Sequence, residues 1–174
     1  MNECAWQSAG VADLLAHALA IEDEACARYR DLADQMDVHN NPAAARFFQR
    51  MAKLEHLHVE KIRTQIGAHA MPRIAPWEYK WQDPEAPETT DFAGVDHMLT
   101  LARALQLALH NEQRACDYFQ AIERAATDRG VRDLARELAD DERQHMEWLA
   151  RELRDAALHP EPARADLDPP LAQE

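Results

Sequence analysis

The chain has 174 residues, of which 47% are hydrophobic and 29% are charged, and this is enough for one domain with a substantial core. Glycine is scarce, with 4 residues, while the helix formers Ala, Leu, Glu and Arg are abundant, so the composition favours an all-α fold. The 32 acidic and 19 basic residues give a formal net charge of −13, which repels nucleic-acid phosphates and anionic membranes. Nucleic-acid binding is therefore not expected.

The first ten residues contain no Lys or Arg, and charged residues interrupt the apolar stretch that follows them. This pattern predicts neither a signal peptide nor a membrane span, so we expect a cytoplasmic protein without a membrane partner. The three cysteines, Cys4, Cys26 and Cys116, form no Cys-x-x-Cys pair, and their number is odd. A disulfide framework and a thiolate zinc site are therefore not expected.

The first two predicted helices form a hairpin. Apolar residues recur at steps of three and four from about residue 10 to residue 37, and the polar turn 38–42 ends this pattern. Asn41 is a good N-cap, and Pro42 fits the first position of a second helix that ends at Gly67. We therefore expect two antiparallel helices joined by a short turn.

A long crossover is predicted after the second helix. Four prolines between residues 68 and 91 forbid a long helix there, and three aromatic residues should pack the segment onto the bundle: Trp77, Tyr79 and Trp81. Helical periodicity resumes near Leu101, stops at the turn 127–130, and returns from Val131 to about residue 157. The acidic, Pro-rich residues 159–174 have little apolar surface, so we expect a mobile tail.

Six polar residues interrupt the apolar faces of these predicted helices. They are Glu22 in the first helix, Glu55 and His58 in the second, Glu112 in the third, and Glu142 and His145 in the fourth. Each His follows a Glu by three positions, which places both side chains on one face of the helix. Buried carboxylates are costly without positive partners, and no Lys or Arg falls on the inner faces at those levels. Inward salt bridges are therefore a poor explanation, and bound metal is a better one.

The two halves of the chain repeat this pattern. Glu22 and Glu55 are equally distant in sequence from the turn 38–42 between their helices. Glu112 and Glu142 are nearly equally distant from the turn 127–130. Because such residues face each other across a hairpin, we expect a pseudo-twofold pair of half-sites. The predicted domain covers residues 1–158, and its repeated halves cover about 10–67 and 92–157.

One Glu from each of two helices, with Glu-x-x-His from each of the other two, is the ligand set of carboxylate-bridged di-iron and di-manganese bundles. Carboxylate oxygens with one imidazole per metal suit iron or manganese, whereas a closed zinc site prefers thiolates or more histidine. We therefore predict two iron ions per chain, with manganese as the alternative for the same ligands.

The sequence resembles the rubrerythrin branch of the ferritin-like superfamily in four segments. These are Ala18–Glu22 with Tyr29 seven residues on, Glu55-x-x-His58, Ala108–Glu112, and Glu142-x-x-His145. The resemblance implies a ferritin-like four-helix bundle with a long crossover between the second and third helices. It also implies a homodimer that reduces hydrogen peroxide at a non-haem di-iron centre, with the six polar residues as metal ligands and Tyr29 as a catalytic residue beside them.

Three departures from the family pattern affect the expected chemistry. Rubrerythrins carry a further glutamate three residues after the third-helix ligand, where this sequence has Ala115, so we expect a more symmetric pair of metal sites. The sequence has no rubredoxin-type Cys pairs, so electrons should come from an external donor, such as a separate rubredoxin-type protein. Phe119 takes the place of Tyr29 in the second half, and a role for Tyr29 as an ordinary core aromatic stays open.

These residues leave several functions open. The first is reduction of hydrogen peroxide by two electrons from a ferrous pair. The second is a ferroxidase that oxidises Fe(II) with oxygen or peroxide. A non-catalytic metal-binding subunit and an oxygenase are the remaining alternatives. We predict peroxide reduction, with hydrogen peroxide or oxygen as the small-molecule partner.

Cys26 and Cys116 each follow a predicted ligand by four positions. In antiparallel helices, one turn onward separates the two sulfurs by about 12 Å along the axis, so a disulfide between them is not expected. We expect both thiols to act as small buried hydrophobes, with redox participation as the alternative. Most histidines other than His58 and His145, including His17, are expected on outward faces or in loops.

Overall fold

The structure, a computed structural model, describes residues 4–67, 70–89, 95 and 98–159. They form helices α1 (Cys4–Gln7), α2 (Val11–Val38), α3 (Pro42–Ile66), α4 (Leu101–Ala125) and α5 (Arg129–Leu158), with the 3-10 helix η1 (Pro76–Glu78) between α3 and α4. None of the described residues belongs to a strand. The predicted all-α class is confirmed, and the four long helices begin and end within about two residues of the predicted positions.

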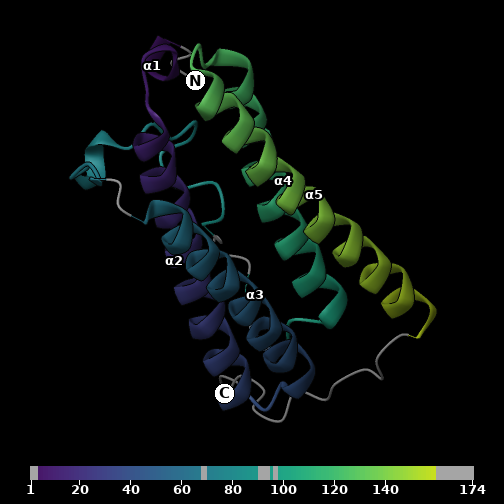
Figure 1. Cartoon of the computed structure of the whole chain (residues 1–174). Coiled ribbons are helices and arrows are strands. Elements are labelled where there is room, and N and C mark those ends of the chain that lie inside the picture. The colour runs from purple at the N-terminus through teal and green to yellow at the C-terminus, as the bar shows by residue number, and fades with distance from the viewer. Residues whose placement is uncertain (1–3, 68–69, 90–94, 96–97, 160–174) are drawn as a thin grey trace.

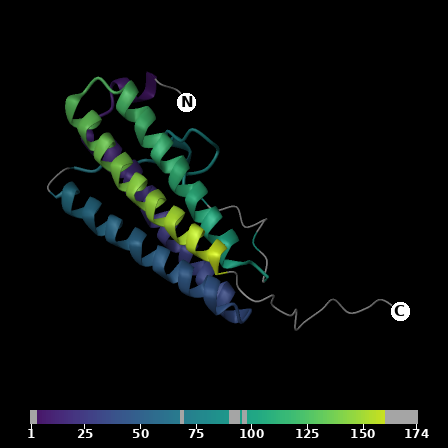
Figure 2. The same cartoon turned by 90° about the vertical axis from the view of Figure 1, so that its right-hand side faces the viewer.

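Two helical hairpins form the bundle (Figure 1). Helix α2 packs along α3, and α4 packs along α5, while α3 approaches α4 and α2 approaches α5 between the hairpins. Helix α4 begins at the end of the bundle where α3 begins (Figures 1 and 2). Helices α2 and α5 therefore run in one direction and α3 and α4 in the other, as expected for a ferritin-like four-helix bundle.

Side-chain caps fix the starts of three long helices. The Asn41 side chain accepts a hydrogen bond from the Ala44 amide at 3.4 Å and donates one to the Leu99 carbonyl at 2.8 Å. It therefore begins α3 and also ties this end of the bundle to the end of the crossover. Thr100 caps α4, and Asp128 caps α5, each by accepting a hydrogen bond from a backbone amide of the first turn. These caps set the turn positions on which the heights of the polar residues depend.

The predicted glutamate and histidine ligands lie at one height along the bundle, and this polar level divides the hydrophobic core into two clusters. One cluster includes Ile21 and Phe119 and lies toward the α1 end, and the other includes Met51 and Leu149. The four predicted glutamate ligands fall between the clusters along their helices. Because burial of apolar surface contributes about 25 cal/mol per Å², these two clusters, and not the polar level, hold the bundle together.

The expectation that His17 lies on an outward face is wrong. His17 is only 1% exposed, its Nδ1 bonds to the Asp13 carbonyl at 2.7 Å, and its Nε2 accepts a hydrogen bond from the Lys80 amide at 3.0 Å. Helix α1 and the crossover cover this face of α2, since Trp6 and Tyr79 both pack edge-on against the His17 ring. The periodicity of α2 alone does not reveal this cover.

The crossover aromatics pack as expected at two of three positions. Tyr79 and Trp81 stack on one another with their ring centroids 4.8 Å apart, and Trp81 also contacts Tyr118 of α4. Trp77, in contrast, is 85% exposed. The prediction that this cluster serves crossover packing is therefore confirmed for Tyr79 and Trp81 and wrong for Trp77.

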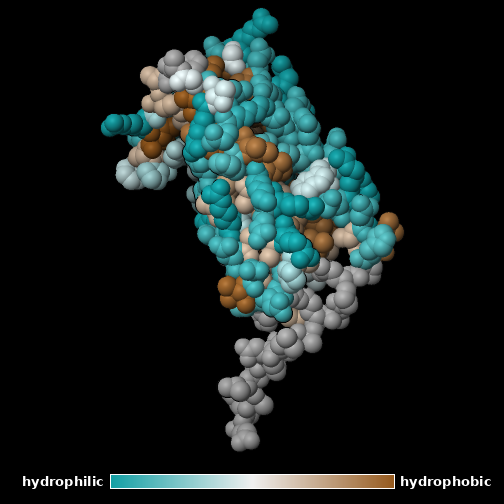
Figure 3. All heavy atoms as spheres, turned by 60° about the horizontal axis from the view of Figure 1, so that its bottom comes forward, coloured by the Kyte–Doolittle hydropathy of each residue, from teal (hydrophilic) through white to brown (hydrophobic). Residues whose placement is uncertain are grey.

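The face drawn in Figure 3 is mostly hydrophilic, with apolar side chains gathered in small separate areas. Across the described residues, no helix combines the length and the apolar character that a membrane span requires. Residues 160–174, which include nearly all of the predicted tail, lie outside the described part of the chain.

Candidate metal centre

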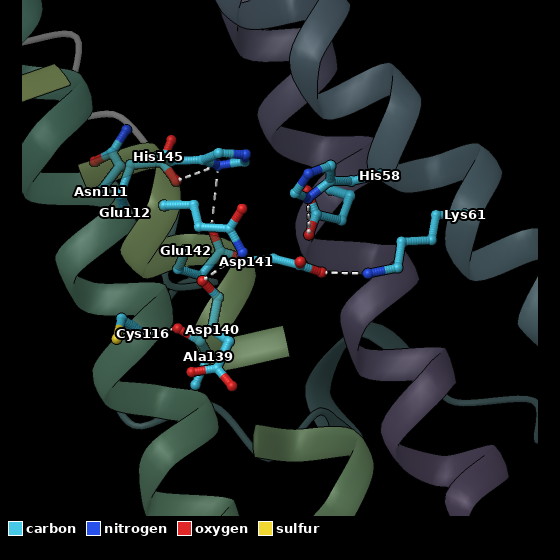
Figure 4. Close-up of polar contacts among 12 residues, drawn as sticks. His58, Lys61, Asn111, Glu112, Cys116, Ala139, Asp140, Asp141, Glu142 and His145 are labelled. Carbon is cyan, nitrogen blue, oxygen red and sulfur yellow. Dashed lines mark hydrogen bonds and ion pairs between the residues drawn. The ribbon is translucent and has the colours of Figure 1, made fainter. Parts of the chain in front are cut away.

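The bundle brings together all six polar residues that the sequence singles out. Their ligand atoms fall into overlapping groups, each within 4.8 Å: Glu55, His58 and His145; Glu22, His58 and Glu142; and Glu112, Glu142 and His145. In Figure 4, His58 and His145 point toward one another from α3 and α5, with Glu112 and Glu142 beside them. Four long helices therefore contribute to one compact cluster at the polar level.

The expected pseudo-twofold relation is visible in the Glu–His pairs. His145 Nδ1 lies 3.0 Å from Glu112 Oε2, and His58 Nδ1 lies 3.6 Å from Glu22 Oε1. Each pair joins the lone glutamate of one helix to the histidine of the following helix. Each hairpin thus provides one imidazole and two carboxylates.

The two cysteines follow the same internal symmetry. Cys26 Sγ donates to the Ala52 carbonyl at 3.3 Å, and Cys116 Sγ donates to the Ala139 carbonyl at 3.6 Å. Both acceptors lie three residues before the Glu-x-x-His glutamate of the facing helix. Both thiols are buried and free, and burial raises the pKa of Cys26. Neither cysteine forms a disulfide, as predicted, and both link helices within a hairpin.

A fifth carboxylate, which the sequence analysis missed, joins the cluster from the crossover. Glu88 is buried, and its ligand oxygen lies within 4.8 Å of oxygens from Glu22 and Glu55. No periodic pattern surrounds it in the sequence, and nothing there distinguishes Glu88 from Glu78 and Glu85 of the same segment. The expectation of symmetric metal sites, based on Ala115, did not include this carboxylate, which shares a ligand group with Glu22 and Glu55 and also raises the pKa of Glu112.

The carboxylates of this cluster are desolvated and unsatisfied. Within the described residues, neither carboxylate oxygen has a hydrogen-bond partner in Glu22, Glu55, Glu88 and Glu142. In Glu112, one of the two oxygens has none. Burial, together with Glu142 nearby, raises the pKa of Glu55 to about 7. Burial and the neighbouring carboxylates also raise the pKa values of Glu22, Glu88 and Glu112 well above their usual range. Such a site stores unfavourable charge that a bound cation would neutralise.

No Lys or Arg among the described residues forms an ion pair with these carboxylates. Lys61, on α3 beside the cluster, instead bonds Asp141 of α5 at 2.5 Å (Figure 4). It also bonds Glu137 of α5 at 3.0 Å. These contacts hold α3 against α5 next to the two histidines. The alternative of inward salt bridges therefore finds no support in the described part of the chain.

Tyr29 lies beside the cluster and is almost completely buried. Its hydroxyl oxygen accepts a hydrogen bond from the Asn111 side chain at 3.3 Å. Burial raises its pKa well above the usual range, and Glu112 and Glu55 raise it further. The phenol therefore keeps its proton at neutral pH.

The donor set fits a pair of hard or borderline divalent ions. Carboxylate oxygens predominate, and there is one imidazole for each ion, a combination that suits iron or manganese. Neither cysteine belongs to any of the ligand groups found in the described residues. The fold and this site together define a ferritin-like bundle with a carboxylate- and histidine-rich site that could hold metal.

Comparisons with known proteins agree with this class. The family model described as Rubrerythrin matches residues 13–96. The crystal structure of an uncharacterized conserved protein from Magnetospirillum magnetotacticum MS-1 is similar, with a TM-score of 0.67 and 32% sequence identity over 90% of this chain and 100% of that chain. No curated protein matches the sequence. The chain therefore belongs to the rubrerythrin family of the ferritin-like di-iron superfamily.

Proposed function

We propose that this protein is a non-haem di-iron oxidoreductase that reduces hydrogen peroxide with electrons from an external donor. The observation that carries the proposal is the buried set of carboxylates around two imidazoles, whose oxygens lack partners among the described residues. Membership of the rubrerythrin family supports iron as the metal and redox chemistry as the activity.

The helices provide the carboxylates and imidazoles that would hold the two ions. Glu22 and Glu112, each close to a histidine, are suited to bind one ion each. Glu142 is close enough to Glu55 to raise its pKa, so these two carboxylates could be shared between the ions. Binding would release the protons that the raised carboxyl pKa values retain, so metal affinity would increase with pH.

When two ferrous ions are bound, they supply the two electrons that, with two protons, convert hydrogen peroxide to two molecules of water. The Tyr29 phenol offers a hydrogen-bond donor beside the carboxylates, and Asn111 orients its oxygen. The His58 and His145 side chains retain 15% and 10% exposure, whereas those of Glu22 and Glu112 have none. A small oxidant would therefore approach from the side of the two imidazoles, which is the more exposed side of the cluster.

Stopped-flow measurements test this proposal. The protein is loaded anaerobically with two equivalents of Fe(II) and mixed with hydrogen peroxide or with oxygen, and the ferric absorbance is followed. We expect peroxide to react faster than oxygen and to convert one peroxide per iron pair. Faster reaction with oxygen, with continued uptake of added Fe(II), would identify a ferroxidase instead.

We also propose a homodimer and a separate electron-donor protein as partners, since the family resemblance implies both. Sedimentation at micromolar concentration tests the first, because a monomer of 19.8 kDa is readily distinguished from a dimer. Steady-state peroxide reduction with a rubredoxin-type donor tests the second. Turnover that needs no added donor protein would contradict it.

A further inference from the structure

Glu88 reaches the carboxylate cluster from an irregular segment and not from a helix. It is only 1% exposed, and neither carboxylate oxygen has a hydrogen-bond partner in the described residues. One of its oxygens lies within 4.8 Å of oxygens from both Glu22 and Glu55. Three carboxylates in such contact repel one another strongly unless a cation lies among them.

Hydrogen bonds on both sides fix the turn that carries Glu88. The Thr89 amide donates to the Ala86 carbonyl at 3.1 Å and closes the turn. The Thr89 hydroxyl donates to Glu24 of α2 at 3.1 Å, and Arg114 of α4 donates to the Thr89 carbonyl at 3.5 Å. These hydrogen bonds hold the backbone of the turn between α2 and α4, next to the carboxylate cluster.

The buried residues around Glu88 distinguish this turn from an ordinary surface loop. Ala86, Pro87 and Thr89 are all buried, whereas Glu85 is exposed. A solvated acidic residue would face outward like Glu85. Here the chain directs one of two nearby glutamates into the cluster and leaves the other in water.

We infer that Glu88 is a seventh metal ligand, supplied by the crossover to the half-site of Glu22 and Glu55. The inference rests on the proposed di-metal function. Ala115 provides no carboxylate at the position where the family has one, and Glu88 provides one from a different element. The two metal sites are therefore unequal. Metal binding at the half-site of Glu22 and Glu55 is coupled to the position of the crossover.

Metal titrations of Glu88→Gln and its matched control Glu85→Gln test this inference. Mn(II), and Fe(II) under anaerobic conditions, are titrated by calorimetry into the metal-free protein. We expect the wild type and Glu85→Gln to bind two ions, and Glu88→Gln to bind one of the two at least about tenfold more weakly. Glu88→Asp, which keeps the charge but shortens the side chain, should give an intermediate affinity.

Amide hydrogen exchange of residues 83–89 provides a readout that does not depend on activity. Metal should slow exchange in the wild type and in Glu85→Gln, and it should have little effect in Glu88→Gln. Equal affinities and equal exchange in all variants would overturn the role of Glu88 and leave the six-residue centre intact. Loss of helical circular dichroism by metal-free Glu88→Gln would also overturn it, because a ligand without protein partners is not needed for folding. Absence of metal binding by the wild type would instead overturn the proposed function.

Discussion

The imidazole rings of His58 and His145 lie face to face at a tilt of 35°, with their centroids 4.5 Å apart. The two residues belong to different hairpins, so this contact joins the two halves of the internal repeat at the polar level. Burial lowers the pKa of His58, and His145 lowers it further, because two adjacent imidazoles resist double protonation. A neutral imidazole is the form that binds metal.

Replacement of either histidine should remove one metal ion. We expect His58→Ala and His145→Ala each to retain about one ion per chain and nearly the full helical circular dichroism, since the apolar clusters hold the bundle together. Elemental analysis after anaerobic reconstitution measures the stoichiometry. His56→Ala is the matched control, because His56 is exposed on the same helix and should leave two ions bound. Unfolding of both variants would identify the histidines as structural residues.

Metal binding and metal-free stability should respond in opposite ways to the loss of a buried carboxylate. We expect Glu22→Gln to raise the free energy of unfolding of the metal-free protein at pH 8 by roughly 1–3 kcal/mol, because it removes a buried charge. The same change should weaken the stabilisation that metal gives, which is about 2.7 kcal/mol when free metal is 100 times Kd. Urea unfolding with and without Mn(II) measures both effects. Glu147→Gln, at an exposed position of α5, should change neither.

His17 should make the metal-free protein less stable in mild acid. Burial lowers its pKa from the usual 6.5, and Lys80 lowers it further. Below pH 6.5 the unfolded chain therefore binds more protons, so this contribution to stability is complete above pH 6.5 and is lost as the pH falls toward the folded pKa. The slope is at most about 1.4 kcal/mol per pH unit.

Urea unfolding between pH 5 and pH 7.5 measures this contribution. The stability difference between the wild type and His17→Gln should shrink as the pH falls, and His110→Gln, at an exposed position of α4, should show no such trend. A difference that is constant across this range would show that His17 does not titrate on unfolding.

Tyr29 should affect chemistry more than stability. We expect Tyr29→Phe to change the free energy of unfolding by about 1 kcal/mol, the value of one buried hydrogen bond. If the phenol assists the reaction, oxidation of the ferrous centre by peroxide should slow by roughly 100-fold. Tyr118→Phe is the control, because Tyr118 is a buried tyrosine on α4 whose hydroxyl has no partner in the described residues. Equal oxidation rates in the two variants would make Tyr29 an ordinary core aromatic.

The amino-acid sequence alone was sufficient to predict the helices and the level of the metal centre. Apolar residues at helical spacing predict four long helices, and the Asn41 cap and the turn 127–130 indicate where two of them begin. Once the turns are fixed, the helical rise sets the height of every side chain, so Glu22 and Glu55 must face each other. Local rules therefore predicted both the fold and the gathering of six polar residues.

Only the tertiary structure decided what lies against these helices from outside. The positions of Glu88 and His17 depend on the path of the crossover and of α1, which have no periodic pattern. Contacts between residues far apart in the sequence fix that path, such as the hydrogen bonds from Thr89 to Glu24 and from the Lys80 amide to His17. Each of these contacts depends on the packing of the whole bundle. An irregular segment has no repeating geometry from which the direction of a side chain follows, so the sequence predicted a crossover without revealing that it brings a carboxylate into the site.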